Sequence, residues 1–141
     1  MKRQIISTEQ APSAVGPYSQ AVRAGDFIFT AGQLGLIPGT MELAGPDIES
    51  QTRQALLNLD AILEAAGSCL KHAVKATVFL TDMGEFPSMN AVYAEFFPEA
   101  PPARAVGQVA ALPQGAKIMI DIVALACDCD SDQASCDCGC A

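Results

Sequence analysis

The sequence contains no tryptophan and a single histidine, His72, and only 17% of its residues are charged. With one histidine the chain has no HExxH motif, no His-rich metal site and no convincing Ser-His-Asp or Cys-His pair. The glycine-rich signatures GxGxxG and GxxxxGK[ST] are also missing, so no usual cradle for a dinucleotide or nucleotide is expected. These absences remove the commonest metal-dependent, nucleophilic and nucleotide-dependent reaction classes.

Long apolar runs and basic clusters are missing as well. No apolar stretch approaches the ~20 residues that a membrane-spanning helix needs. Residues 4–12 lack the apolar core of a secretory signal, so we expect a cytoplasmic protein with no membrane partner. The formal charge is −8, and Lys2-Arg3 is the only basic pair. Because nothing basic would meet a phosphate backbone, no nucleic-acid partner is expected.

The six cysteines are unevenly distributed. Cys69 stands alone, whereas the other five crowd into residues 127–141 together with four aspartates. This pattern predicts a body without a disulfide framework. We therefore divide the 141 residues into one domain, 1–126, and a tail, 127–141. The CxC and CxCxC spacings of the tail are open to two interpretations, a soft-metal site or an acidic appendage.

One helix is predicted over residues 48–66. Asp47 is a suitable N-cap, the apolar positions that follow fall three or four residues apart, and Gly67 stands where a helix-ending glycine belongs. A second helix is predicted between Phe86 and Phe97, because its apolar residues have the same spacing and Pro98 prevents its continuation.

Strands are predicted around these helices. Residues 18–23 form a short strand before a Gly-Asp turn, and residues 27–31 form a short apolar run. Residues 74–81 alternate, residues 104–109 follow a stiff Pro-Pro pair, and residues 117–126 are almost continuously apolar. The last pattern is typical of a strand buried on both faces. We predict an α+β fold, a mixed β-sheet with two helices on one face. Since two helices cannot cover both faces, we also predict a homo-oligomer.

Two charged residues in apolar surroundings are candidates for chemistry. Arg104 opens a strand directly after Pro101-Pro102-Ala103, which would aim a guanidinium at a carboxylate or phosphate. The alternative is a structural salt bridge with a surface acid. Asp121 is the lone acid within the strand at 117–126 and is a candidate for proton handling. Its alternative is a carboxylate that reaches solvent or is satisfied by Lys117 or Arg104.

Two further residues have a functional and a structural interpretation. Tyr18, in the segment GPYSQ, could cap a pocket with its ring or hydroxyl, or simply pack. Gly32 could let a ligand approach the backbone, or merely end a strand. The residues alone leave both pairs of alternatives open.

With these residues placed, the chain resembles the RidA family of reactive-intermediate (enamine/imine) deaminases, also called YjgF-type proteins. The resemblance runs almost without a break from Ile5 to Ala126. The matching stretches are APSAVGPYSQAV at 11–22, FIFTAGQL at 27–34, TRQALLNLDAILEAAG at 52–67, VKATVFLTDMGEF at 74–86, MNAVYAEFF at 89–97 and PPARAVGQVAALPQGAKIMIDIVALA at 101–126. The cysteine-rich tail lies outside it.

The resemblance implies a chorismate-mutase-like fold, assembled as a homotrimer with ligand sites in the clefts between subunits. It implies deamination of 2-imino acids and their enamine tautomers, such as 2-iminobutanoate and 2-iminopropanoate, without a cofactor. Residue by residue, it makes Arg104 the carboxylate-binding arginine and Asp121 the acid, usually glutamate, that positions water. Tyr18, Gly32 and Asn90 correspond to family residues near the ligand.

The chain departs from the family pattern at four positions. Val106 replaces a pocket cysteine, Gln108 an acid and Ala31 a serine, and Asp121 is one methylene shorter than glutamate. The leading hypothesis is hydrolysis of a 2-imino acid to a 2-keto acid and ammonia, with Val106 shaping the pocket. The departures motivate an alternative, a non-catalytic trimer that binds small keto or amino acids. A nuclease ranks below both, because the body carries a net charge of −4.

Overall fold

Residues 2–127 are described by the computed structural model. Their helices are α1 (Ile48–Ala65) and α2 (Phe86–Phe96), with short 3-10 turns at Leu70–His72, Met83–Glu85 and Pro113–Gly115. Their strands are β1 (Arg3–Ile6), β2 (Ala21–Ala24), β3 (Phe27–Thr30), β4 (Gln33–Leu34), β5 (Ala73–Leu80), β6 (Ala103–Gln108) and β7 (Ile118–Leu125). The predicted α+β class is therefore correct, although β1 and β4 were not predicted.

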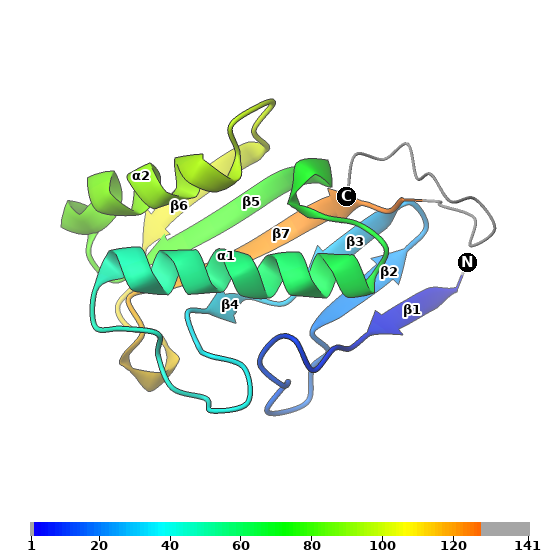
Figure 1. The fold of residues 1–141 in the computed structure, drawn as a ribbon, viewed down its shortest axis with the longest axis horizontal. Helices are drawn as coiled ribbons and strands as arrows, with labels where there is room; N and C mark the ends of the chain where they lie inside the picture. Colours follow the sequence, from blue (N-terminus) through cyan, green and yellow to red (C-terminus); the bar gives the residue numbers. More distant parts are fainter. Residues whose placement is uncertain (1, 128–141) are drawn as a thin grey trace.

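The seven strands form a single mixed sheet. Its order is β1-β2-β3-β7-β5-β6, and β4 pairs with β7 beside β3. β5 and β6 run parallel, and the other pairs are antiparallel. Figure 1 shows α1 and α2 on the same side of this sheet. This confirms the predicted mixed sheet with both helices on one face.

The ends of α1 follow from local chemistry. The carboxylate of Asp47 accepts a hydrogen bond from the backbone N–H of Ser50 at 2.9 Å, as an N-cap does. At the other end Gly67 has a φ of +80°, and the N–H of Ser68 donates to the carbonyl of Leu63 at 2.8 Å. A left-handed glycine is what lets the chain turn back over the last helical carbonyls.

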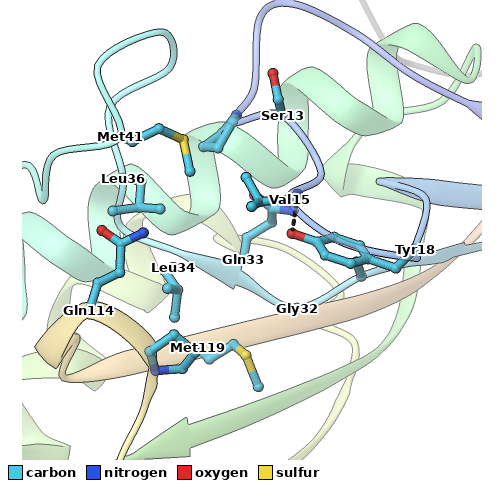
Figure 2. Close-up of a pocket in the computed structure, with 13 residues that line it drawn as sticks. Ser13, Val15, Tyr18, Gly32, Gln33, Leu34, Leu36, Met41, Gln114 and Met119 are labelled. Carbon is cyan, nitrogen blue, oxygen red and sulfur yellow. Dashed lines mark hydrogen bonds between the residues drawn. The ribbon is translucent and has the colours of Figure 1, made fainter.

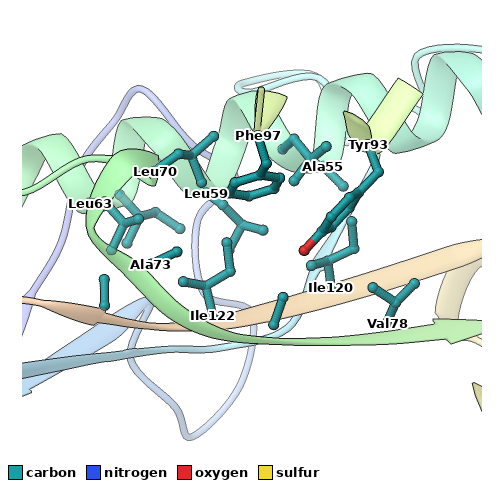
Figure 3. Packing of buried hydrophobic residues seen from close by; sticks show 14 of the residues in the cluster. Ala55, Leu59, Leu63, Leu70, Ala73, Val78, Tyr93, Phe97, Ile120 and Ile122 are labelled. Carbon is teal, nitrogen blue, oxygen red and sulfur yellow. The ribbon is translucent and has the colours of Figure 1, made fainter. Parts of the chain in front are cut away.

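A hydrophobic core fills the space between the helices and the sheet. Figure 3 shows Leu59 of α1 and the aromatic pair Tyr93 and Phe97 facing Ile120 and Ile122 of β7. All five are buried. The alternation of β7 explains this, because every second residue of a strand points to the same face.

The opposite face of the sheet is open within one chain. Phe27 and Phe29 of β3 are 43% and 47% exposed, and they pair with Leu125 and Val123 of β7. The prediction that residues 117–126 form a strand buried on both faces is therefore wrong for a single chain. The apolar residues of this second face have no cover in the described part of the molecule.

The sequence led to two predictions about the cysteines, one on disulfides in the body and one on a metal site in the tail. Cys69 is disulfide-bonded, a bond that the prediction of a body without a disulfide framework did not foresee. The candidate metal site of the tail lies outside the described residues, except for Cys127. Within residues 2–127, no three or more His, Cys, Asp or Glu side chains are grouped to hold a metal ion.

The helices in that range are too short or too polar to cross a membrane.

The left-handed glycine gives a test of the helix end. Gly67→Ala is expected to lower the free energy of unfolding by about 1–2 kcal/mol, because a Cβ disfavours positive φ. Gly67→Asn is the matched control, since asparagine tolerates this conformation better. Urea denaturation of the two variants measures the difference. Equal losses for alanine and asparagine would contradict the explanation.

Candidate functional site

Arg104 lies on the helix-facing side of β6, where it meets α2. Its Nη1 donates a hydrogen bond to Oδ1 of Asn90 at 2.8 Å. Its Cζ lies 4.7 Å from the ring centroid of Tyr93 and 5.5 Å from that of Phe86. Positions 86, 90 and 93 are four and three residues apart, so one face of α2 presents all three side chains to the guanidinium.

None of the groups that hold Arg104 is an acid. Within residues 2–127, Arg104 forms no salt bridge, whereas Arg53 pairs with Glu95 and Lys117 with Glu85, each at 2.7 Å. The alternative that Arg104 serves a structural salt bridge therefore has no support in the described chain. A half-buried guanidinium held by neutral groups keeps its charge and most of its N–H donors for a ligand.

A cavity of about 410 Å³ adjoins this arginine. Its walls are mostly apolar, with the guanidinium and one amide as the polar groups. The lining residues are Asn90, Tyr93, Ala94, Phe97, Pro101, Pro102 and Arg104. An apolar hollow with one fixed cation suits a small carboxylate that carries an apolar substituent.

Tyr18 and Gly32 lie together in a second cavity, of about 520 Å³. Figure 2 shows the Tyr18 hydroxyl beside Val15, whose N–H donates to it at 3.1 Å. The ring is 52% exposed, so it is not a core residue. The structure therefore places Tyr18 at the mouth of a pocket, and the packing alternative does not describe it.

Gly32 packs closely on Met119. A Cβ at this position would lie 2.7 Å from Sδ of Met119, so the flexible end of that side chain would have to shift for a larger residue. The glycine lets the backbone before β4 lie against β7, and it also lines the second cavity. Met41 and Gln114 line the same cavity with φ values of +58°, which side chains rarely adopt. No sequence pattern indicated these two residues.

Asp121 lies on the open face of the sheet, opposite Thr77. Burial raises the pKa of its carboxyl, and a hydrogen bond from Thr77 partly opposes that rise. Arg104 is in register with Ala76 and Ile122, which face the helices. Since adjacent residues point to opposite faces, one chain does not bring Arg104 and Asp121 together.

The structure places the two departures on β6 in structural contacts. Val106 is half-buried against the hydrophobic core and lines neither cavity. Oε1 of Gln108 accepts a hydrogen bond from the backbone N–H of Met83 at 2.9 Å, which ties the end of β6 to the turn before α2. Ala31, the third departure, lines the cavity that contains Tyr18.

The residues that hold Arg104 from α2 were only partly foreseen. Asn90 was named through the resemblance, whereas Phe86 and Tyr93 were assigned to the apolar pattern of a helix. The sequence shows that these residues share one helix face, but it does not show that β6 pairs with β5 and lies beside α2. Only the folded chain shows that the aromatic face of α2 meets an arginine.

Comparison with known proteins agrees with this geometry. Residues 8–126 match the family model described as Endoribonuclease L-PSP. The chain therefore belongs to this family, the RidA or YjgF-type proteins. It is 46% identical to Reactive Intermediate Deaminase A, chloroplastic, of Arabidopsis thaliana, over 88% of this chain and 66% of that protein.

Two further relatives are informative. The 2-iminobutanoate/2-iminopropanoate deaminase of Bos taurus is 46% identical over 87% of this chain and 90% of its own length. Among solved structures, Escherichia coli TdcF with bound serine is 41% identical, with a TM-score of 0.83. That comparison covers 86% of this chain and 98% of the other. The mixed sheet with two helices is thus the fold of the family.

The raised pKa of Asp121 predicts a pH effect on stability. The folded chain binds this proton more tightly than the unfolded chain, so the favourable contribution is present at low pH and is lost as pH rises through the folded pKa. Asp121→Asn is expected to raise the melting temperature, by a margin that widens from pH 4 to pH 7. Asp26→Asn, an exposed control, measures the effect of removing one negative charge. A margin for Asp121→Asn that narrows with pH would contradict the assignment.

Proposed function

We propose that this protein hydrolyses 2-imino acids and their enamine tautomers to 2-keto acids and ammonia. The observation that carries the proposal is Arg104, a fixed guanidinium beside an apolar cavity with no acid paired to it among residues 2–127. The names of two relatives support the reaction, and a third relative binds serine, a small molecule with a carboxylate. We take 2-iminobutanoate and 2-iminopropanoate as the substrates.

Arg104 provides the binding step of this mechanism. Two parallel N–H groups of a guanidinium match the two oxygens of a carboxylate. Holding the carboxylate in this way orients the adjacent C=N carbon, and orientation alone is worth several orders of magnitude in rate. Asn90 accepts a hydrogen bond from one N–H group of the guanidinium, and the two aromatic rings pack against its Cζ. The guanidinium is therefore oriented before the substrate arrives.

Asp121 provides the proton-transfer step. Its carboxylate orients a water molecule and removes a proton as the oxygen adds to the C=N carbon. The proton that reaches nitrogen then allows the C–N bond to break, which leaves a keto group and ammonia. One water molecule supplies the keto oxygen and two hydrogens, which join the imine N–H to give ammonia, so the reaction balances without a cofactor.

The active assembly in this proposal is a homotrimer, with each site between two subunits. Arg104 and Asn90 come from one chain, whereas Tyr18, Gly32 and Asp121 come from the next. Two observations support this division. Arg104 and Asp121 lie on opposite faces of one sheet, and the face that carries Asp121 exposes apolar side chains such as Phe27 and Phe29. Burial of that face against other copies removes apolar area from water.

The proposal extends to cellular context. Substrates that are small metabolic carboxylates fit a cytoplasmic protein, and no nucleic acid or membrane partner is invoked. The rival function is a trimer that binds small keto or amino acids without turnover. Binding of 2-ketobutyrate together with an absence of imine hydrolysis would favour that rival.

The reaction is tested by coupling the protein to a dehydratase that releases the imine, with semicarbazide as the trap. The protein is expected to lower the trapped imine and to speed formation of the keto acid. Arg104→Ala is expected to lose about tenfold to a hundredfold in kcat/KM, because a charge-assisted contact to the carboxylate is removed. An unchanged trapped signal with the wild-type protein would refute the proposed activity.

The same assay separates the two roles. Asp121→Asn is expected to retain binding of 2-ketobutyrate in calorimetry and to lose about a hundredfold or more in kcat, the usual contribution of a general base. Equal losses of binding in both variants would contradict the assignment of separate roles to Arg104 and Asp121.

The assembly is tested on the open face. Phe29→Asp puts a charge at the centre of that face and is expected to dissociate the trimer in analytical ultracentrifugation and to abolish turnover. Leu57→Asp is the matched control, because Leu57 is equally exposed but lies on α1, on the helix side of the sheet. Dissociation by Leu57→Asp, or an intact active trimer with Phe29→Asp, would place the interface elsewhere.

A further inference from the structure

The guanidinium of Arg104 is positioned by side chains that carry no charge. An arginine that is partly withdrawn from water is often paired with a carboxylate, which fixes its geometry but also neutralises it. Here the partners are one amide and two aromatic rings, all from α2. The rings attract the cation through their electron-rich faces, and they cannot compete with an incoming anion.

Tyr93 is a rigid support for this purpose. It is 5% exposed, and its ring packs against that of Phe97 in a tilted arrangement, with centroids 4.7 Å apart and planes 37° apart. Figure 3 shows both rings pointing from α2 into the core. Phe86, seven residues earlier and half-buried against the same core, supplies the second ring, which also lies against Cζ of Arg104. Because core packing fixes both rings, the guanidinium has a fixed surface to lie on.

The ring of Tyr93, rather than its hydroxyl, performs this role. Its hydroxyl is buried without a hydrogen-bond partner among the described residues. Burial raises the pKa of that hydroxyl, although the positive charge of Arg104 opposes the rise. The phenol is therefore neutral at physiological pH, and no phenolate forms to neutralise the guanidinium.

We propose that Phe86 and Tyr93 are positioning residues, an aromatic cradle that aims Arg104 while leaving its charge uncompensated, and that this sets the preference of the site for a carboxylate over a neutral group. The inference deepens the proposed function and relies on it for the identity of the ligand. The statement that the two rings orient Arg104 depends only on their contacts with the guanidinium, and not on the identity of the ligand.

The test compares two probes in calorimetry with the full-length protein, pyruvate and its neutral amide, pyruvamide. Tyr93→Leu and Phe86→Leu are each expected to reduce the ratio of pyruvate to pyruvamide affinity by about threefold to thirtyfold, the range of one cation–π contact. Tyr93→Phe, which keeps the ring, is expected to retain the ratio. Phe96→Leu is the matched control, because it removes an aromatic ring from α2 that does not lie against the guanidinium of Arg104.

A second measurement needs no ligand. In ¹⁵N NMR of the unliganded protein, the Nε–Hε group of Arg104 is expected to be ordered in the wild type and in Tyr93→Phe, and mobile in Tyr93→Leu and Phe86→Leu. Leucine variants that leave Arg104 ordered would overturn the proposal. So would equal weakening of pyruvate and pyruvamide, which is the result of a purely structural role, or a loss in Tyr93→Phe as large as that in Tyr93→Leu.

The outcomes also separate this inference from the proposed function. If the leucine variants lose preference for pyruvate over pyruvamide while the wild-type protein does not hydrolyse the imine, the deaminase is refuted and the cradle is upheld. A protein that hydrolyses the imine with undiminished carboxylate preference in both leucine variants would uphold the deaminase and refute the cradle.

Discussion

The contact between Arg104 and one face of α2 is the interaction around which the candidate site is arranged. A guanidinium in a half-buried place needs partners, and α2 supplies an amide and two rings instead of an acid. The same helix packs on the core through Tyr93 and Met89, so the stability of the core and the geometry of the arginine depend on the same side chains. The positive charge is thereby both fixed and unneutralised.

The sheet imposes the second constraint. Both helices cover one face, which places Arg104 on the covered side of β6 and Asp121 on the open side of β7. A single chain therefore separates the carboxylate-binding group from the group proposed to handle protons. In the proposed trimer a second copy would cover the open face and supply the missing half of each site. Assembly of the trimer would then account both for the exposed apolar side chains on that face and for the completion of the proposed catalytic site.

Sequence reasoning succeeded where the pattern is local. The spacing of apolar residues and the caps at Asp47 and Gly67 placed α1 to within one residue. It failed where pairing partners decide the structure. β4 has two residues, and the Gly35 that follows it lets the chain pass close to the backbone of α1, where a Cβ would lie 2.5 Å from the carbonyl oxygen of Gln51. β7 is apolar except for Asp121, yet only one of its faces is covered within the chain.

For the site, the sequence alone determined which residue types are present and which reactions they permit. One histidine and few charges excluded several reaction classes, and an arginine after a Pro-Pro pair became a candidate either for recognition of a small anion or for a structural salt bridge. The resemblance favoured the first of these. Only the tertiary structure decided that Arg104 meets Phe86, Asn90 and Tyr93 and that Asp121 faces the other way. The physical reason is that strand pairing and helix packing join residues distant in sequence, and no local spacing encodes which face of the sheet will be covered.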